Sequence, residues 1–385
     1  MHPKFIGNPR FGVIPLALGV CALALSACGT TTPTHPAKSS AKSSSASSPA
    51  AAATGNPSTP VTLNEAGSTL IYPYLQVLAP QVHAAYSNIT LAPGPGGSGL
   101  GISEAVGKLV QMGGSDAYLS PAQATANPSL LNIPIAISAQ AVDYNVPGMP
   151  ANLKITGNIL AQMYEGKITE WNDPQLARIN PGVTLPAVKV VPVRRVDSSG
   201  DTFIFTSLLT KTNTAWANGP AFGTTVTWPS VSNELTANGN PGMIQVCKAN
   251  PGCIAYIGVS VENTALQQGL QEALLQNQAG KYLVPDLATI TSAVNASSGS
   301  TPANLRQSLI YSSGANSYPI INFEYLMIQQ TQPNPTTAQA IRTFLYWAIS
   351  PTGGATGGNL SAVNFVALPT SVIPKVEAAI NKITG

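Results

Sequence analysis

Residues 194–209, RRVDSSGDTFIFTSLL, join two arginines, two aspartates and a Ser-Ser-Gly turn to an apolar run with helical spacing. The valine-rich residues 188–196 just before the turn predict a strand. A helix that begins after a strand presents unpaired N–H groups and the positive end of its dipole, which suits an anion. Arg195 adds a planar fork for a tetrahedral oxyanion. The alternative is that Asp197 or Ser198 only caps the helix while the arginine faces solvent.

Three other loops of small residues resemble this one. Residues 65–69, EAGST, form a small-residue turn before an apolar segment, and Ser98 lies in the glycine-rich segment 94–108, GPGGSGLGISEAVGK. Asp116 follows a Gly-Gly-Ser run at the end of an expected strand. Each loop alone indicates no more than a turn. Four such loops at strand ends or helix starts favour one binding site where they converge.

An enzyme is the competing interpretation, and the histidines argue against it. The chain has three: His2 and His35 lie near the N-terminus, and only His83 belongs to the expected folded body, on the surface of a helix. Ser-His-Asp hydrolysis therefore has little support, a histidine-rich metal site is excluded, and no Walker A motif is present. We expect no catalysis, no metal and no cofactor, with phosphatase activity as the weaker alternative.

Composition and patterning bound the fold class. A chain of 385 residues with 44% hydrophobic residues is long enough for two domains. Charged residues make up 9%, the formal net charge is +3, and no Lys/Arg cluster suggests a nucleic-acid partner. Helical and strand patterns alternate from residue 61, which predicts an α/β fold with largely parallel strands. The expected helices include residues 102–112, 159–171, 202–209, 338–349 and 372–383, and the expected strands 131–145, 188–196 and 318–328.

The N-terminus carries the pattern of a processed, lipid-anchored protein. Lys4 and Arg10 precede an apolar stretch over residues 11–25, which predicts a signal peptide over residues 1–27. The tetrapeptide LSAC, residues 25–28, looks like a bacterial lipobox, so we expect cleavage before Cys28 and a membrane anchor on its thiol. The alternative is plain secretion. Residues 28–60 are mostly Ala, Ser, Thr, Pro, Lys and Gly, which predicts a disordered tether.

Two cysteines remain for the folded body, since Cys21 leaves with the signal peptide. Cys247 and Cys253 lie in CKANPGC, where an Asn-Pro-Gly turn can bring their sulfurs together. A secreted chain meets oxidising conditions, so we expect a disulfide. A metal site is the competing interpretation, but no histidine or further cysteine stands nearby.

Several longer motifs carry a family resemblance from about residue 64 to the end of the chain. They are EAGSTLIYP, GGSGLGI, GGSDAYLS, MYEGKITEWNDPQLARINPGVTLP, RRVDSSGDTFIFTSLLT, NPGMIQVCKANPGCIAYIG, YPIINFEYLMI and FVALPTSVIPKVEAAI. In this order they resemble the phosphate-binding proteins of the high-affinity phosphate ABC transporter, the PstS type. Within this family the chain looks closest to a mycobacterial phosphate-binding lipoprotein antigen.

The resemblance implies a type II periplasmic-binding-protein (Venus-flytrap) fold, α/β with two domains and two hinge strands. Domain I would comprise residues 61–140 and 319–385, and domain II residues 141–318. It also implies that phosphate is held by the residues matching Thr69, Leu70 (backbone N–H), Ser98, Asp116, Arg195, Ser199, Gly200 (backbone N–H) and Asp201. Asp197 matches an acid that pairs with the arginine. The implied partners are phosphate and a membrane permease, and we expect a monomer.

Two positions depart from the usual family pattern. Leu70 replaces a phenylalanine, which is tolerable because its backbone binds the ligand. Asp201 stands where many members have threonine.

A buried carboxylate that faces an oxyanion needs a proton between the two groups, so Asp116 would select phosphate over sulfate. If Asp201 also faces the ligand, we expect affinity to hold or rise as the pH falls below about 7. The alternatives are that Asp201 caps its helix, that the ligand is sulfate or molybdate, or that the protein is a phosphate sensor without a transport role.

Overall fold

A computed structural model of the chain describes residues 54–385 as a mixed α/β fold. The expected signal peptide, the lipidation site Cys28 and most of the expected tether lie outside these residues. Residues 54–60, which composition assigns to the tether, lie against the folded body. The Gly55 N–H donates to Thr343 Oγ1 at 2.9 Å, and the Asn56 Oδ1 accepts from the Asn88 N–H at 3.0 Å.

The fold is built on a main nine-stranded sheet and a small three-stranded one. The main sheet has the order β2-β1-β3-β12-β4-β8-β6-β7, with β9 also paired to β4. Its strands are β1 (Val61–Gly67), β2 (Ile89–Pro95), β3 (Met112–Ser115), β4 (Leu130–Asn145), β6 (Val191–Arg195), β7 (Leu235–Ala237), β8 (Cys253–Gly258), β9 (Gln271–Glu272) and β12 (Ile321–Gln329). The small sheet has the order β11-β10-β5 and consists of β5 (Lys154–Ile155), β10 (Leu274–Gln276) and β11 (Tyr282–Leu283).

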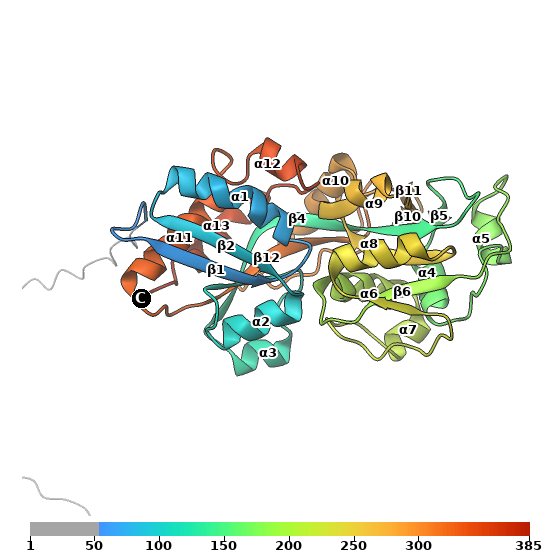
Figure 1. Cartoon of the computed structure of the whole chain (residues 1–385), viewed down its shortest axis with the longest axis horizontal. Coiled ribbons are helices and arrows are strands. Elements are labelled where there is room, and N and C mark those ends of the chain that lie inside the picture. The colour runs from blue at the N-terminus through green and yellow to red at the C-terminus, as the bar shows by residue number, and fades with distance from the viewer. Residues whose placement is uncertain (1–53) are drawn as a thin grey trace, which may run out of the picture. The chain divides into compact units, whose positions relative to one another are not determined.

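The long strand β4 belongs to two parts of the main sheet (Figure 1). Its residues 130–139 pair with β12, and its residues 140–145 pair with β8. We call β1, β2, β3, β12 and residues 130–139 of β4 the first half of the sheet. Residues 140–145 of β4 with β6, β7, β8 and β9 form the second half. The chain leaves the first half along β4 and returns at β12, where Ile321 pairs with Ala139.

The strand directions are more mixed than the alternation of patterns predicts. β1 runs parallel to β2 and β3, and β6 runs parallel to β7 and β8. β12 is antiparallel to both β3 and β4, and β4 is antiparallel to β8. The prediction of largely parallel strands is therefore wrong for the centre of the sheet, because the strand that leaves the first half and the strand that returns to it run in opposite directions.

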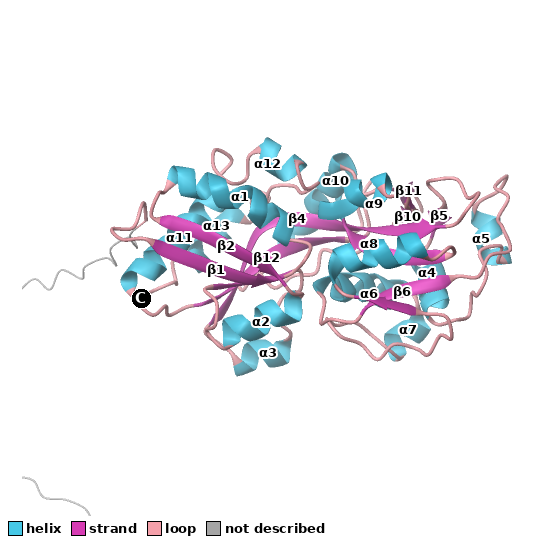
Figure 2. Ribbon diagram, in the orientation of Figure 1, coloured by secondary structure: helices cyan, strands magenta, loops and turns pink. Residues whose placement is uncertain are grey.

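Helices flank the strands in both halves (Figure 2). Those that follow the strands of the first half are α1 (Tyr72–Ala85), α2 (Ser98–Val106) and α3 (Pro121–Ala126), joined by α11 (Pro335–Ala348), α12 (Gly357–Ser361) and α13 (Ile373–Ile380). The intervening chain forms α4 (Gly157–Tyr164), α5 (Pro174–Ile179), α6 (Gly200–Thr212), α7 (Thr214–Asn218), α8 (Gly239–Ala249), α9 (Glu262–Gln267) and α10 (Leu287–Ser297). Short 3₁₀ turns cover Val259–Val261 and Ser298–Ser300.

The expected elements at 131–145, 188–196, 202–209, 318–328, 338–349 and 372–383 all exist, with shifted ends. The helix expected at 102–112 begins earlier, at Ser98, and ends at Val106. Gly107 and Lys108 terminate the helix. Lys108 takes a positive φ of 57°, which is incompatible with a right-handed α-helix. Residues 159–171 likewise hold a shorter helix, because Gly166 takes a φ of +67° after α4.

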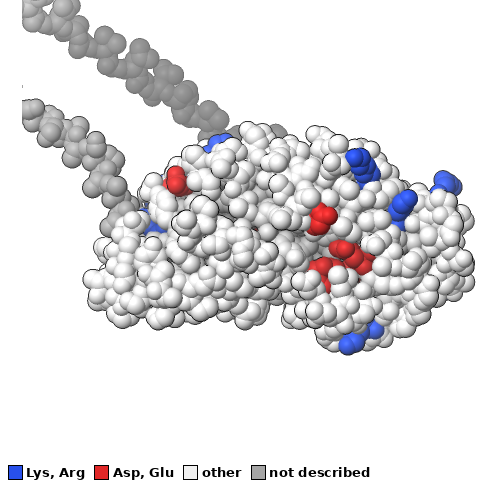
Figure 3. All heavy atoms as spheres, turned by 90° about the horizontal axis from the view of Figure 1, so that it is seen from above, with Lys and Arg blue, Asp and Glu red and all other residues white. Residues whose placement is uncertain are grey.

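Cys247 at the end of α8 and Cys253 at the start of β8 form a disulfide, with their Cα atoms 5.2 Å apart. The bond fastens a helix to the strand that follows it. Within residues 54–385, no helix combines the length and apolar character needed to cross a bilayer. The face in Figure 3 is mostly uncharged, in keeping with a chain in which 9% of residues are charged.

Candidate functional site

The loop after β1 is held in place by glycines that let backbones touch. A Cβ atom on Gly67 would lie 2.1 Å from the Gly114 carbonyl oxygen, so a larger residue cannot occupy this position. The Gly67 carbonyl accepts the N–H groups of Gly96 and Gly97, both at 2.7 Å. The loops after β1, β2 and β3 therefore meet at one end of the first half.

Asp116, directly after β3, lies at this meeting point and is 1% exposed. Its Oδ2 accepts the Ser98 hydroxyl at 3.3 Å, and its Oδ1 accepts the Ser68 hydroxyl. The Ser68 hydroxyl oxygen in turn accepts the backbone N–H of Leu70 at 2.9 Å. The first half thus supplies one carboxylate surrounded by hydroxyl groups and backbone amides, with no cation of its own in these contacts.

Arg195, at the end of β6, lies opposite in the second half and has a side chain that is 1% exposed. Its Nε donates to Asp197 Oδ1 at 2.7 Å and its Nη2 to Asp197 Oδ2, so the pair is bidentate. Its Nη1 donates to Asp201 Oδ2 at 2.7 Å. Two carboxylates therefore fix the plane of the guanidinium group.

The Asp201 carboxylate, in the first turn of α6, accepts from three different side chains. Besides Arg195, the Asn240 amide donates to Oδ2 at 2.9 Å and the Gln140 amide to Oδ1 at 3.1 Å. Ser199 is the N-cap of α6, and its hydroxyl oxygen accepts the Thr202 N–H at 3.3 Å. Asp201 is therefore not the cap of its helix, because Ser199 has that position.

The two halves touch directly at the site. A Cβ atom on Gly200 would lie 2.3 Å from Asp116 Oδ2 and 2.4 Å from the Ser98 hydroxyl oxygen. The Gly99 N–H donates to the Ser198 carbonyl at 2.9 Å. Only a glycine at position 200 permits this approach.

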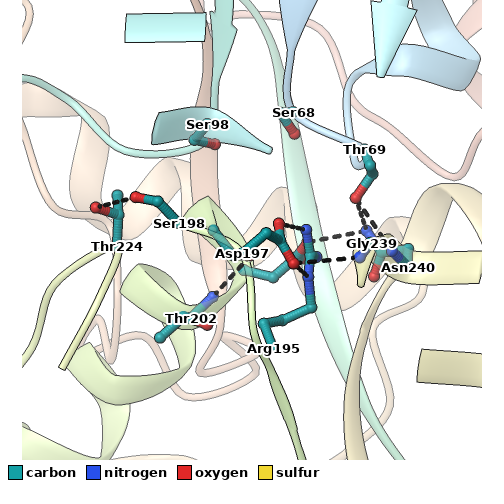
Figure 4. A network of polar contacts seen from close by, with 12 residues as sticks. Ser68, Thr69, Ser98, Arg195, Asp197, Ser198, Thr202, Thr224, Gly239 and Asn240 are labelled. Carbon is teal, nitrogen blue, oxygen red and sulfur yellow. Dashed lines mark hydrogen bonds and ion pairs between the residues drawn. The ribbon is translucent and has the colours of Figure 1, made fainter. Parts of the chain in front are cut away.

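Asn240 joins the halves at another point. Its backbone and side-chain N–H groups donate to Thr69 Oγ1 at 3.1 and 3.2 Å, and the same side chain contacts Asp201. Figure 4 shows Ser68, Thr69 and Ser98 facing the group formed by Arg195, Asp197 and Asn240. The predicted residues from the loops after β1 and β2 and from the segment after β6 thus lie around one site.

The N-termini of α1, α2, α6 and α8 all reach this place, through Thr69, Ser98, Gly200 and Asn240. Each terminus has N–H groups that the helix does not use, and each helix dipole is positive there. An anion bound here would be held mostly by neutral donors, since Asp197 and Asp201 already offset the charge of Arg195.

The carboxyl groups of Asp116 and Asp201 are hard to ionise. Burial, and secondarily the negative charge of Asp201, raise the pKa of Asp116 to about 7. Burial also raises the pKa of Asp201, but Arg195 opposes this shift. The two carboxylates beside Arg195 raise the pKa of its guanidinium group above its usual value against the effect of burial.

Sequence reasoning missed Ser68, Gln140, Asn240 and Glu324. Ser68 and Asn240 lie inside motifs that resemble the family. The motifs therefore marked these segments, but they did not indicate which contacts the two side chains make. Gln140 lies at the crossing of β4 and reaches Asp201 by tertiary packing alone. Glu324 on β12 is fully buried and neighbours Asp116, since both contact the Asn322 amide, and this proximity depends on the strand register. His83 is exposed on α1, as expected, and is not among these contacts.

In the described part of the chain, no group of three or more His, Cys, Asp or Glu side chains is arranged to hold a metal ion. The site instead offers hydroxyl groups, backbone amides, one guanidinium group and one acceptor carboxylate. Such a set suits an oxyanion that can donate a hydrogen bond of its own.

The sheet order, the crossing strands and the site between the halves are those of a two-lobed binding protein of the type II periplasmic fold. A periplasmic high-affinity phosphate-binding protein solved with phosphate at pH 8.5 has this fold: the TM-score is 0.64 at 21% identity, over 83% of this chain and 93% of that one. At this level of identity the likeness establishes the fold.

Sequence comparisons place the chain more closely. The PBP superfamily domain matches residues 44–352. The phosphate-binding protein PstS of Methanocaldococcus jannaschii is 30% identical over 85% of this chain and 87% of its own length. PstS3 of Mycobacterium bovis is 29% identical over 97% and 99%. The chain therefore belongs to the PBP superfamily and, within it, to the family of the PstS phosphate-binding proteins.

Proposed function

We propose that the protein binds inorganic phosphate between the two halves of the sheet and delivers it to the permease of a phosphate ABC transporter. The observation that carries this is the buried Asp116, an acceptor placed among helix N-termini and opposite Arg195. The names of the relatives support the choice of ligand.

In this proposal most of the ligand's oxygens accept hydrogen bonds. The donors are the hydroxyl groups of Thr69, Ser98 and Ser199, the guanidinium of Arg195, and the backbone N–H groups of Leu70 and Gly200. On binding, the Ser98 hydroxyl and the Leu70 N–H would exchange Asp116 and Ser68 for the ligand. Asp116 accepts a hydrogen bond from a protonated oxygen of the ligand, which phosphate has and sulfate lacks at neutral pH. Charge-assisted hydrogen bonds of this kind contribute about 1.5–3 kcal/mol each.

Asp201 acts mainly through Arg195. Its oxygens already accept from Arg195, Asn240 and Gln140, so it does not need a second proton from the ligand. This argues against the expectation that two acceptors require a doubly protonated phosphate. A singly protonated phosphate, which donates one hydrogen bond to Asp116, is enough to satisfy the site.

The site spans two bodies that close over the ligand by hinge motion. We assign residues 61–140 and 319–385 to domain I and residues 141–318 to domain II, since β4 changes its partner between Ala139 and Gln140. Contacts such as Asn240 to Thr69 would close the cleft and exclude water. No bond of the ligand is made or broken in this process, so we propose a binding protein and not an enzyme.

The protein would work outside the cytoplasm, as a monomer on a lipid anchor at Cys28. The signal-peptide pattern of residues 1–27 and the disulfide between Cys247 and Cys253 support export. Two acyl chains or more would give stable anchoring, whereas a single chain gives only reversible binding.

Competition binding with the purified protein tests the proposal. Labelled phosphate is displaced with unlabelled phosphate, arsenate, sulfate and molybdate at pH 7. We expect arsenate to compete, because it keeps a proton at this pH, and sulfate and molybdate to fail. Displacement by sulfate as strong as by phosphate would overturn the assignment.

A further inference from the structure

Behind Asp116 lies a second carboxyl group, that of Glu324 on β12, which is fully buried. The Asn322 amide nitrogen lies 3.1 Å from Glu324 Oε1 and 3.2 Å from the Asp116 carbonyl oxygen, so the two residues are neighbours, and each carboxyl group shifts the pKa of the other. A hydrogen bond between two carboxyl groups requires a proton on one of them. The question is which group holds it.

The contacts of Glu324 favour Glu324 as the holder. Its Oε1 accepts the Asn322 amide at 3.1 Å and contacts the Ser138 hydroxyl, and its Oε2 has no other partner. Ser138 Oγ also contacts Asn322 Oδ1 at 2.8 Å, yet it has a single proton to give. Asn322 cannot be turned round, because its Nδ2 faces the carbonyl oxygens of Asp116 and Phe323. Glu324 therefore has one amide donor and a share of one hydroxyl proton, which is too little to stabilise a buried negative charge, so its neutral form is favoured.

The contacts of Asp116 favour the ionised form instead. It accepts two hydroxyl groups, from Ser68 and Ser98, and it faces Arg195 across the halves. The other charged groups around it are Glu65 on β1 and Asp201 on α6. Glu65 takes its own donors from the N–H groups of Gly94 and Gly114, at 3.4 and 3.1 Å.

We propose that Glu324 stays protonated and donates its proton to Asp116, which keeps Asp116 an acceptor for the ligand. Glu324 is then a positioning residue that determines specificity without touching the ligand. This inference rests on the proposed phosphate function. If the proton lay on Asp116 instead, that side chain could donate to sulfate, and the preference for a protonated oxyanion would be lost.

The arrangement also sets an upper pH limit. Burial and the neighbouring charge of Asp116 raise the pKa of Glu324 well above its ordinary value, so Glu324 keeps its proton near neutrality. Once Glu324 ionises, two buried negative charges face the ligand and affinity falls. Above that point one proton must be taken up for each ligand bound, so the loss approaches about tenfold per pH unit.

The test compares wild type with Glu324→Gln from pH 5 to 9, measuring Kd for phosphate and sulfate. The glutamine amide donates to Asp116 at every pH. We expect the ratio of the wild-type to the variant Kd for phosphate to be flat below neutrality and to rise by up to about tenfold per unit above the ionisation of Glu324. Taking this ratio cancels the titration of phosphate itself. A ratio that stays constant to pH 9 overturns the proposal.

Glu262→Gln is the matched control. Glu262 is a buried acid on α9 that makes none of the site contacts described above, and its variant should keep the wild-type pH profile for phosphate. Glu324→Leu removes the donor altogether. We expect it to narrow the preference for phosphate over sulfate about tenfold, because Asp116 then protonates more easily. An unchanged preference in this variant also contradicts the proposal.

Infrared difference spectroscopy between wild type and Glu324→Gln at pH 7 locates the proton independently of binding. A carbonyl band of a protonated carboxyl group that disappears in the variant supports the assignment, and its absence from wild type overturns it. If wild type binds no phosphate, the proposed function fails, while the infrared result still decides where the proton lies.

Discussion

The two halves of the sheet treat buried carboxylates in opposite ways. In the second half, Asp197 and Asp201 flank Arg195 and share its positive charge. In the first half, Glu65, Asp116 and Glu324 are buried with hydroxyl groups and backbone amides but no lysine or arginine among their hydrogen-bond partners. The same type of side chain therefore orients a cation on one side and has a raised pKa on the other.

This difference shows how one anion site can contain so many acids. Acids paired with arginine add geometry without adding net repulsion. Acids that keep a proton add a hydrogen-bond preference without a full negative charge. A site built only from cations would bind any oxyanion, whereas this division of roles favours a ligand that carries hydrogen.

The largest effect is expected from Arg195→Met, which removes the cation of the second half. It leaves Asp197 and Asp201 without their shared partner, and the loss of a buried pair of this kind costs about 3–5 kcal/mol of stability. Phosphate affinity should fall by more than about a hundredfold. Calorimetric titration and chemical unfolding measure the two effects.

Arg194→Met is the control for this prediction. Arg194 pairs with Glu234, and both side chains are partly exposed, at 23% and 20%. Its loss should change affinity and stability little. Equal effects at positions 194 and 195 would show that the buried cation has no special role.

The next effect concerns the acceptor of the first half. Asp116→Asn turns an acceptor into a donor, so phosphate affinity should fall about 10- to 100-fold, the equivalent of one charge-assisted hydrogen bond. Sulfate binding should become measurable in the same variant. Competition assays at pH 7 measure the preference for phosphate over sulfate. If this preference is the same in the variant and in wild type, Asp116 does not select the ligand.

A smaller effect is expected where the halves join. Asn240→Ala removes an amide that contacts both Thr69 and Asp201, so phosphate should bind about tenfold more weakly. Asn238→Ala is the matched control, because Asn238 is exposed and its side chain makes no cap hydrogen bond. If the two variants bind phosphate equally well, the Asn240 contacts between the halves contribute nothing to binding.

The smallest effect on binding, and a clear one on stability, is expected from Glu262→Gln. Burial raises the pKa of Glu262 to about 8, against about 4.3 for an unfolded chain. The folded state therefore keeps a proton that the unfolded state releases. Its contribution to stability is complete below about pH 4 and is lost as the pH rises towards 8, at about 1.4 kcal/mol per pH unit. Urea unfolding from pH 5 to 8 should show a shallower decline in the variant, and an equally steep decline would contradict the assignment.

Much of the site could be predicted from sequence because its residues lie in local motifs. Thr69, Ser98, Asp116 and Arg195 each follow a strand or begin a helix, and such positions are read from short patterns. The helix of residues 200–212 and the long strand of residues 130–145 were also predictable, since their apolar patterns are continuous.

What escaped prediction depends on register and on contacts between distant segments. Glu324 approaches Asp116 because β12 pairs with β3 so that Tyr325 lies beside Ser115. Gln140 and Asn240 meet at Asp201 from separate parts of the chain, and nothing in their local sequence marks them. The antiparallel centre of the sheet follows from the return of the chain, which alternating patterns cannot reveal.

The partner change within β4 has a consequence for synthesis. All strands of the second half lie between residues 140 and 272, so that half is complete once this stretch has emerged. The first half lacks β12 until residues 321–329 appear, although its own first strand is made long before. The second half of the sheet can therefore form first during synthesis, and the first half is completed only when β12 pairs with β3 and β4.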